Sequence, residues 1–383
     1  MRGEMRTHTA EAGFSLVELL AATTISLIVL GTAMATFKDA VAMNDTATNL
    51  ADASSNLRGG TNFLVRDLVS AGRLIPTGGI PIPSGSGAQP IARPSPPGTP
   101  RYFDNTTQTS LPAITTGAGL GPTVDSQATD IITILTVDPI LDACRNGPLV
   151  LNVAGTGGNV PTIAADGSYF SVGTNVPCLP TGTATGTWIV GDATQGQSPL
   201  KKGDLILFTD PNGQNAIQTV TKTDATTVYF EANAYDTFGF NQRSAPAGSI
   251  TQIVRSPPVT GTLQQLQAQR VLMWTYYVDS STGGQPHMMR QLNNFTPQAL
   301  AGIVEDLELS YDLVDGSPTP PTNVKTLPFT QGGNSYTASN IRKVNVHIGV
   351  RSEAMSTKQH DYLRNHLSTV VSLRSLAYVD RYK

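Results

Sequence analysis

The sequence predicts an α+β protein in which one long N-terminal helix packs on an antiparallel β-sheet body with an inserted β-rich subdomain. Three observations predict this fold. Residues 14–36 are mostly apolar with a single charge, and the chain behind them keeps an apolar stripe without any proline up to residue 74. From residue 129 onward, short apolar or alternating runs are separated by turn signals. The predicted parts of the chain are a short leader (1–13), an apolar helix (14–36), its amphipathic continuation (37–74), a proline- and glycine-rich loop or linker (75–128), a β-rich inserted region (129–256) and the C-terminal β-sheet part of the body (257–383).

The apolar run 14–36 is long enough to cross a membrane. As a helix it would measure about 35 Å, against a hydrocarbon core of about 30 Å. It exceeds the apolar core of a secretory signal peptide, and its small-residue site, Gly13, precedes the run instead of following it. The single charge, Glu18, is costly in a membrane and therefore needs a partner. Cleavage after Gly13 would supply one, because the new amine of Phe14 on a neighbouring copy could pair with Glu18; the alternative is a plain anchor whose Glu18 reaches toward the lipid headgroups.

Residues 13–19 read Gly-Phe-Ser-Leu-Val-Glu-Leu and are followed by about twenty apolar residues. This combination closely resembles the processing signal of type IV prepilins. The resemblance implies cleavage after Gly13 by a prepilin peptidase, N-methylation of Phe14 by the same enzyme, and one inner-membrane span with a periplasmic body. The leader 1–13 contains two arginines but also two glutamates, so its charge indicates the orientation only weakly.

Residues 37–74 are predicted to continue the helix as an amphipathic segment. Leu50, Leu57 and Leu64 recur every seven residues, and Phe63 widens the stripe that they form. One apolar side on a polar helix is expected where the helix packs on a sheet. We expect Gly59–Gly60 to loosen or bend this helix and the chain to leave it before Pro76.

Composition limits the function classes. Charged residues make up 14% of the chain and the net charge is −3, so no basic excess points to nucleic acid. The two cysteines, Cys144 and Cys178, lie in the part expected outside the cytoplasm, where disulfides persist. A disulfide between them is expected, and it would contribute about 3–4 kcal/mol by closing a loop of about 35 residues. The alternative is two free thiols, and neither cysteine belongs to a Cys-x-x-Cys pair.

The segment 75–128 is rich in proline and glycine, with ten prolines and eight glycines between Pro76 and Pro122. Such a segment cannot continue a helix or a central strand. We expect a long surface loop or linker. It serves either as a spacer, which is the preferred interpretation, or as an exposed recognition loop.

Strands are predicted for most of the remaining chain. Their expected positions are 130–137, 203–208, 216–221, 226–231, 249–255, 271–278, 287–292, 305–313, 344–350 and 369–376. Runs 271–278 and 287–292 are predicted to form a hairpin, and 369–376 an edge or closing strand. Asp210 and Asn212 lie in an Asp-Pro-Asn-Gly turn signal; a calcium site is the alternative, but two such oxygens are too few.

Three C-terminal stretches indicate which group within the type IV pilin superfamily the chain resembles. Residues 304–311, 341–351 and 370–376, taken in that order, are similar to PilW-type minor pilins and to the related J-type pseudopilins of type II secretion. The strands near residues 203–207 also look PilW-like, whereas J-type pseudopilins are usually shorter and lack such an insert. Each stretch alone is weak evidence for this group, and the resemblance to the superfamily rests on the N-terminal signal.

No enzyme motif, cofactor site or metal site is predicted. The phosphate-binding, zinc-peptidase and serine-hydrolase signatures are all missing from the sequence. His360 and His366 are six apart, which does not place them on one helical face. The acidic residues Glu305, Asp306 and Glu308 are best interpreted as part of a solvated strand face. Trp188 and Trp274 are expected to pack in the core and not to bind sugars.

The resemblance implies a minor pilin that waits in the inner membrane with its body in the periplasm. It would then join other minor and major pilins, with the help of the inner-membrane assembly platform, prime pilus assembly, and lie at the tip of a cell-surface pilus. Two alternatives stay open: a pseudopilin that serves type II secretion, and an adhesive or ligand-binding module at the pilus tip.

Overall fold

The structure, a computed structural model, describes residues 15–375 apart from a set of gaps. The gaps are 77, 99, 105–106, 142–146, 154–160, 173–199, 225, 256–263, 282–283, 316–318, 357–360 and 374. The predicted features that lie outside the described residues are the leader 1–13, Gly13, Phe14, Cys144, Cys178, Trp188 and His360. Processing after Gly13 and the disulfide therefore stay predictions.

The chain divides into two compact units. One consists of Met1–Asp52 together with Ser352–Leu363, and the other of Ala53–Arg351 together with Arg364–Lys383. We call the second unit the body. The division crosses the first helix between Asp52 and Ala53.

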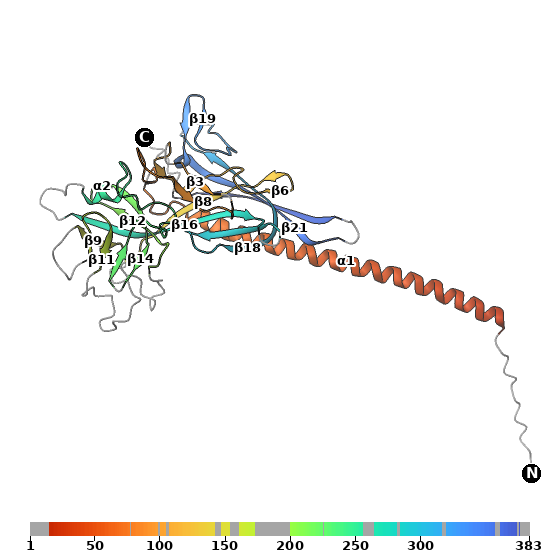
Figure 1. Cartoon of the computed structure of the whole chain (residues 1–383). Coiled ribbons are helices and arrows are strands. Elements are labelled where there is room, and N and C mark those ends of the chain that lie inside the picture. The colour runs from red at the N-terminus through yellow and green to blue at the C-terminus, as the bar shows by residue number, and fades with distance from the viewer. Residues whose placement is uncertain are drawn as a thin grey trace, which may run out of the picture. The chain divides into compact units, whose positions relative to one another are not determined.

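Helix α1 (Leu16–Ser70) is continuous over 55 residues, and Figure 1 shows it as one unbroken coil. It begins after Ser15 and ends before Gly72, which adopts a left-handed φ of 77° that glycine accommodates easily. Gly59–Gly60, expected to loosen the helix, lies within it without a break. Gly60 is instead a point of close approach, because a Cβ there would lie 3.0 Å from Ala301 Cβ.

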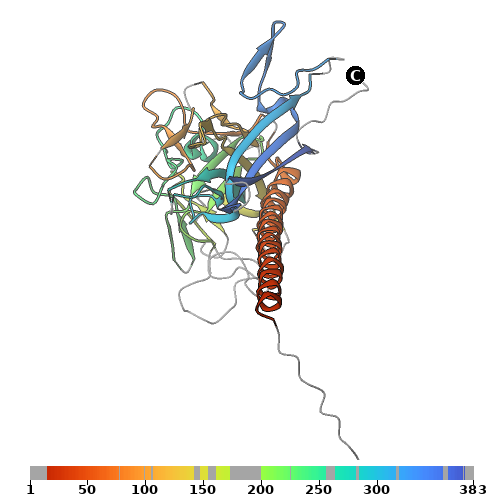
Figure 2. The ribbon, with the colours of Figure 1, turned by 90° about the vertical axis from the view of Figure 1, so that its right-hand side faces the viewer.

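The part of α1 in the body is amphipathic, as the stripe predicts. Its buried apolar side chains are Ala53, Leu57, Leu64 and Leu68. They share one core with apolar side chains of the C-terminal strands, among them Leu307 and Ile348. The predicted packing of the helix on an antiparallel sheet is thereby confirmed, and both views show the orange end of α1 beside the strands drawn in blue (Figures 1 and 2).

The sheet of the body is organised around the long strand β16 (Gln265–Asp279). In the described part of the chain this sheet has fourteen strands, and its path runs β14-β15-β11-β10-β9-β16-β17-β18-β21-β22, with β8 and β12 also paired to β16. Along this path up to β21, and where β8 and β12 pair with β16, all strand pairs are antiparallel except β9 with β10. The strands up to β16 in this sheet are β5 (Ile114–Thr115), β8 (Ile132–Asp138), β9 (Leu149–Val153), β10 (Thr162–Ile163), β11 (Tyr169–Ser171), β12 (Leu205–Thr209), β13 (Asn215–Thr219), β14 (Lys222–Thr223) and β15 (Thr227–Tyr229).

The C-terminal strands follow the predicted alternation. They are β17 (His287–Leu292), β18 (Gln298–Leu313), β21 (Ile341–Met355) and β22 (Tyr362–Ser372), with the small hairpin β19 (Phe329–Gln331) and β20 (Asn334–Tyr336) and a 3-10 turn (Ala338–Asn340) between β18 and β21. In β18, Leu307, Leu309 and Tyr311 are buried while Glu308 and Ser310 are partly exposed. β16 and β17 form the predicted hairpin, and β22 is the edge strand of the sheet.

The proline- and glycine-rich segment, expected to be a surface loop or linker, is packed onto the body. Its strands are β1 (Ile80–Pro81), β2 (Ile91–Arg93), β3 (Arg101–Phe103), β4 (Ser110–Leu111), β5, β6 (Thr123–Val124) and β7 (Gln127–Ala128). Ile80, Ile91, Phe103 and Leu111 are at most 3% exposed and share a core with β8, β12, β13 and β16. Pairs such as β1 with β4 and β2 with β3 close the segment on itself.

The part of the chain between β8 and β16 contributes most of a further core around Phe170, Phe208 and Phe230, whose ring centroids are 5.4–6.4 Å apart. The residues expected as a strand at 249–255 form a short helix instead, α2 (Ile250–Val254). The reason is the spacing of Ile250, Ile253 and Val254, which places all three on one buried helical face. These strands belong to the body and share β16 with it, so a separate inserted subdomain stays a prediction.

The predicted turn at Asp210 forms between β12 and β13. Asp210 Oδ1 accepts the N–H groups of Asn212 at 2.9 Å and Gln214 at 2.7 Å. The carboxylate thus binds its own backbone, which is the turn interpretation and not the calcium alternative.

Candidate functional site

The described site residue with the strongest sequence signal is Glu18, in the first turn of α1. The Ser15 N–H donates to Glu18 Oε2 at 3.1 Å, and the Val17 N–H donates to Ser15 Oγ at 3.3 Å. The glutamate contact is that of a capping box, in which a glutamate accepts the N–H of a serine three residues before it, while the serine hydroxyl here accepts the N–H two residues on. The negative charge of Glu18 therefore lies at the positive end of the helix dipole, beside Ser15.

The first part of α1 exposes large apolar side chains around its whole circumference. They are 57–78% exposed and comprise Leu16, Val17, Leu19, Leu20, Ile25, Leu27, Ile28, Val29, Leu30, Met34 and Phe37. The most apolar window of this helix has a mean hydropathy of 1.9, and by length and composition the helix can cross a membrane. A helix that is apolar on every side is typical of burial in a membrane or in an assembly.

The threonine hydroxyls in this run need no partner outside the helix. Thr23 and Thr24 both donate to the Leu20 carbonyl, at 3.0 and 2.7 Å. Thr32 donates to the Val29 carbonyl at 2.9 Å in the same way. Backbone and hydroxyl groups satisfied within one helix are what an apolar environment requires.

A buried ion pair fixes the other part of α1 to the sheet. Asp67 Oδ2 accepts the hydroxyl of Tyr276 at 2.6 Å and the Arg290 Nε–H at 2.8 Å, and both Asp67 and Arg290 are at most 10% exposed. The Arg290 guanidinium lies 3.3 Å from the centroid of the Trp274 ring and near Phe63. Trp274 thus packs in the body, whereas no sequence pattern predicts the pairing of Asp67 with Arg290.

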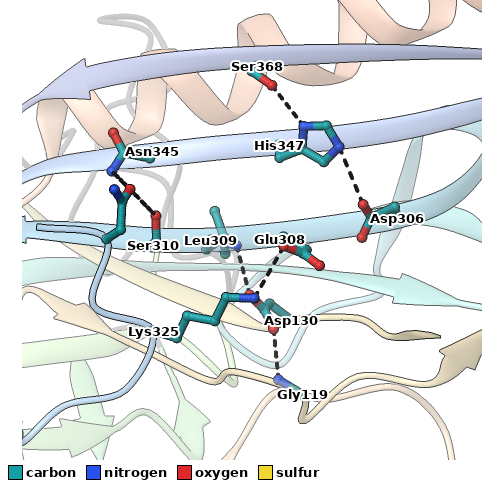
Figure 3. A network of polar contacts seen from close by, with 11 residues as sticks. Gly119, Asp130, Asp306, Glu308, Leu309, Ser310, Lys325, Asn345, His347 and Ser368 are labelled. Atoms are coloured by element: carbon teal, nitrogen blue, oxygen red, sulfur yellow. Dashed lines mark hydrogen bonds and ion pairs between the residues drawn. The ribbon is translucent and has the colours of Figure 1, made fainter.

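The polar face of the C-terminal strands carries a line of side chains across β22, β21 and β18 (Figure 3). Ser368 Oγ lies 2.8 Å from His347 Nδ1, and His347 Nε2 lies 3.5 Å from Asp306 Oδ2. A histidine between serine and carboxylate activates serine in hydrolases, but 3.5 Å exceeds hydrogen-bond reach. The ring also stacks on His366 with centroids 5.5 Å apart. We interpret this line as a cross-strand polar ladder on a partly solvated face.

Below this face, Asp130 joins two parts of the body. Its carboxylate accepts the N–H groups of Gly119 and Leu309, both at 2.7 Å, as Figure 3 shows. Burial raises the pKa of Asp130, and the two amide donors partly offset that effect. Within the described ranges, no group of three or more His, Cys, Asp or Glu side chains is placed to hold a metal ion.

Burial also raises the pKa of Asp204 above its ordinary value of 3.8. Between the ordinary and the raised pKa the folded chain binds more protons than the unfolded chain, so the free energy of unfolding increases as the pH falls through that interval. We expect Asp204→Asn to weaken this increase as the pH falls toward 3.8, the ordinary pKa of the carboxyl group. The amide oxygen can still accept the Lys201 N–H that Asp204 binds at 2.9 Å. Urea unfolding at a series of pH values tests this, and an unchanged pH dependence in the variant would contradict it.

Comparison with known protein families, curated proteins and solved structures yields no match to this chain. The functional conclusion therefore depends on the residues themselves.

Proposed function

We propose that this chain is a minor pilin of a type IV pilus, of the PilW type, which primes pilus assembly and lies at the pilus tip. The observation that supports the proposal is the contrast within one continuous helix, α1. Its first part exposes apolar side chains all round, and its last turns are buried in a β-sheet body. A subunit that inserts one end into a membrane or a filament core and displays a folded body at the other needs this contrast.

The proposed mechanism assigns each part a task. A prepilin peptidase cleaves after Gly13 and methylates Phe14, and the first part of α1 holds the mature chain in the inner membrane. On assembly the same surface packs against the helices of other pilins in the filament core. Glu18 pairs there with the Phe14 amine of a neighbouring copy, while the body faces outward.

The proposal is tested by shearing surface fibres from cells and identifying the N-terminal peptide in the fibre and membrane fractions by mass spectrometry. A methylated Phe14 terminus in the fibre fraction is the expected result. The same terminus confined to membranes would favour a secretion pseudopilin. Retention of Met1 in both fractions would contradict processing altogether.

Glu18 itself allows a sharper test, because a helix cap and a charge partner require different chemistry. Glutamine can take the place of glutamate in a capping box but carries no charge. We expect Glu18→Gln to block incorporation into fibres as fully as Glu18→Ala does, with both proteins still present in membranes. Quantitative immunoblots of sheared fibres measure this.

Asp39→Ala is the matched control, since Asp39 is an exposed acid on the same helix beyond the apolar run. It should be incorporated as the wild type is. Normal incorporation of the Glu18→Gln protein would assign Glu18 to helix capping alone and contradict the charge-pairing mechanism.

A further inference from the structure

Strand β22 (Tyr362–Ser372) ends the sheet of the body on one side, and among the described residues no strand pairs with its outer edge. A free edge carries a row of backbone N–H and C=O groups to which another strand can add. Natural proteins protect such edges with charges, prolines, bulges or a cover. The residues of β22 therefore show where its edge is protected and where it is open.

The contacts of β22 with β21 show which of its backbone groups point to the free edge. The Leu373 N–H donates to the Arg342 carbonyl at 2.9 Å, and Ser368 Oγ lies 2.8 Å from His347 Nδ1 (Figure 3). Both contacts fit one antiparallel register, with Leu373 opposite Arg342 and Ser368 opposite His347. Residues that exchange backbone hydrogen bonds with a neighbouring strand alternate with residues whose backbone groups point away from it. Since Leu373 bonds to β21, the outward backbone groups belong to residues 364, 366, 368, 370 and 372.

The first half of this edge is protected. The outward N–H of His366 donates to the Asn365 side chain at 2.9 Å, and Asn365 Nδ2 donates to Ser54 Oγ of α1 at 3.0 Å. Arg364 adds a charge, which an ion pair holds against Glu305 at 2.9 Å. An incoming strand would have to displace the first contact and cover the charge. We therefore expect no strand to pair with this half.

The second half of the edge, residues 367–373, lacks these protections. Its sequence is Leu-Ser-Thr-Val-Val-Ser-Leu, without a charge, a proline or a glycine. An uncharged segment with valine and threonine at a sheet edge is prone to pair with another strand. Val370, on the same face of the sheet as Ser368, is 59% exposed. A strand added here would cover this side chain as well as the outward backbone groups.

The open segment is complementary to itself. If two copies pair antiparallel with Val370 opposite Val370 of the partner subunit, Ser368 lies opposite Ser372 of the partner subunit. Apolar side chains then meet at the centre, hydroxyl groups meet on either side of it, and no two charges meet. The outward residues form three pairs with two backbone hydrogen bonds each, about six in all. A register shifted by two residues would set Val370 against a serine.

We propose that residues 367–373 are an interface between two copies of this chain, which pair edge to edge and continue the sheet across both bodies. The two-fold axis passes between the two Val370 residues, perpendicular to the sheet. It reverses the turns of α1 that pack on the sheet, so the two copies point in opposite directions. The pairing thus joins copies that approach each other from opposite sides, as subunits of two different fibres can. That last step rests on the proposed function, whereas the pairing itself does not.

Cross-linking that depends on the register tests the pairing in the purified full chain in detergent. In Val370→Cys the two new thiols meet at the axis, with Cβ atoms about 5 Å apart, and a short bis-maleimide should join them into a dimer on denaturing gels. His366→Cys is the matched control, because this exposed residue would lie about 26 Å from its own counterpart. The unsubstituted chain gives the background from Cys144 and Cys178. Equal dimer yields in the two variants, or none above background in Val370→Cys, would overturn the proposal.

A second variant separates this edge from the apolar part of α1 as the cause of association. Val370→Lys protects the open half as natural edges are protected, and in the pair it sets two ammonium groups against each other. We expect dimerisation at least about tenfold weaker by analytical ultracentrifugation, with the melting temperature of the monomer unchanged. His366→Lys should dimerise as the wild type does. Dimers that persist unchanged in Val370→Lys, or a wild-type chain that is monomeric throughout the concentration series, would contradict the proposed interface.

Discussion

Replacement of Leu64 by alanine is expected to lower the free energy of unfolding of the body by about 2–5 kcal/mol. Leu64 is fully buried in the core that α1 shares with the C-terminal strands. Its truncation removes apolar contacts and leaves a cavity between helix and sheet. The neighbouring strands are held by long runs of backbone hydrogen bonds, so they cannot easily move in to fill this cavity. Urea unfolding of the full chain in detergent, followed by tryptophan fluorescence, measures the change.

Leu27→Ala is the matched control for this prediction. Leu27 is on the same helix but is 68% exposed, and the same substitution there should change the unfolding of the body by no more than about 0.5 kcal/mol. The contrast tests the division of α1 into an exposed apolar part and a buried part. Similar losses in the two variants, or no loss at Leu64, would contradict it.

The parts of the fold that the sequence predicts are those with a sustained pattern. The helix up to Ser70 is predictable because its apolar run and stripe extend over tens of residues without proline. Strands β18 and β21 are predictable because apolar and polar residues alternate along them, as Leu307 and Glu308 illustrate. Such patterns depend on whether each residue is buried or exposed, so they can be recognised without knowing which distant residues it contacts.

Short elements stabilised by distant contacts could not be predicted. The strands of the proline- and glycine-rich segment have two or three residues each, too few to show a period, and Ile80 or Phe103 is indistinguishable in sequence from a loop residue. α2 shows the same ambiguity, since a five-residue apolar run fits a strand as well as a helical turn. A cavity near Arg93 is bordered by residues of several such short elements, so no sequence pattern predicts it.

The buried polar contacts were missed for a related reason. Asp67 is separated by 209 residues from Tyr276 and by 223 from Arg290, and nothing local to any of them indicates the pairing. By contrast, Glu18 was predictable as a site because a lone acid in an apolar run violates the local pattern. Its role in the capping box could also have been read from the serine three residues before it.

Replacement of Asp67 by alanine is expected to cost about 3–5 kcal/mol in the free energy of unfolding, because it leaves the buried Arg290 charge without its partner. Asp67 accepts both Arg290 and Tyr276, and neither is open to water that could replace the carboxylate. Arg66→Ala is the matched control, since Arg66 approaches the same carboxylate at 3.5 Å but is 63% exposed. An exposed ion pair contributes at most about 1 kcal/mol.

A double variant separates the cost of the unpaired charge from the loss of packing. Adding Arg290→Met to Asp67→Ala removes the buried cation while keeping an apolar side chain of similar length near Trp274. If the unpaired charge dominates, the double variant should be more stable than Asp67→Ala alone by about 1–3 kcal/mol, measured by the same urea unfolding. If the double variant is instead no more stable than Asp67→Ala, the unpaired charge costs little. The attachment of α1 to the sheet then depends on the apolar core around Leu64 alone.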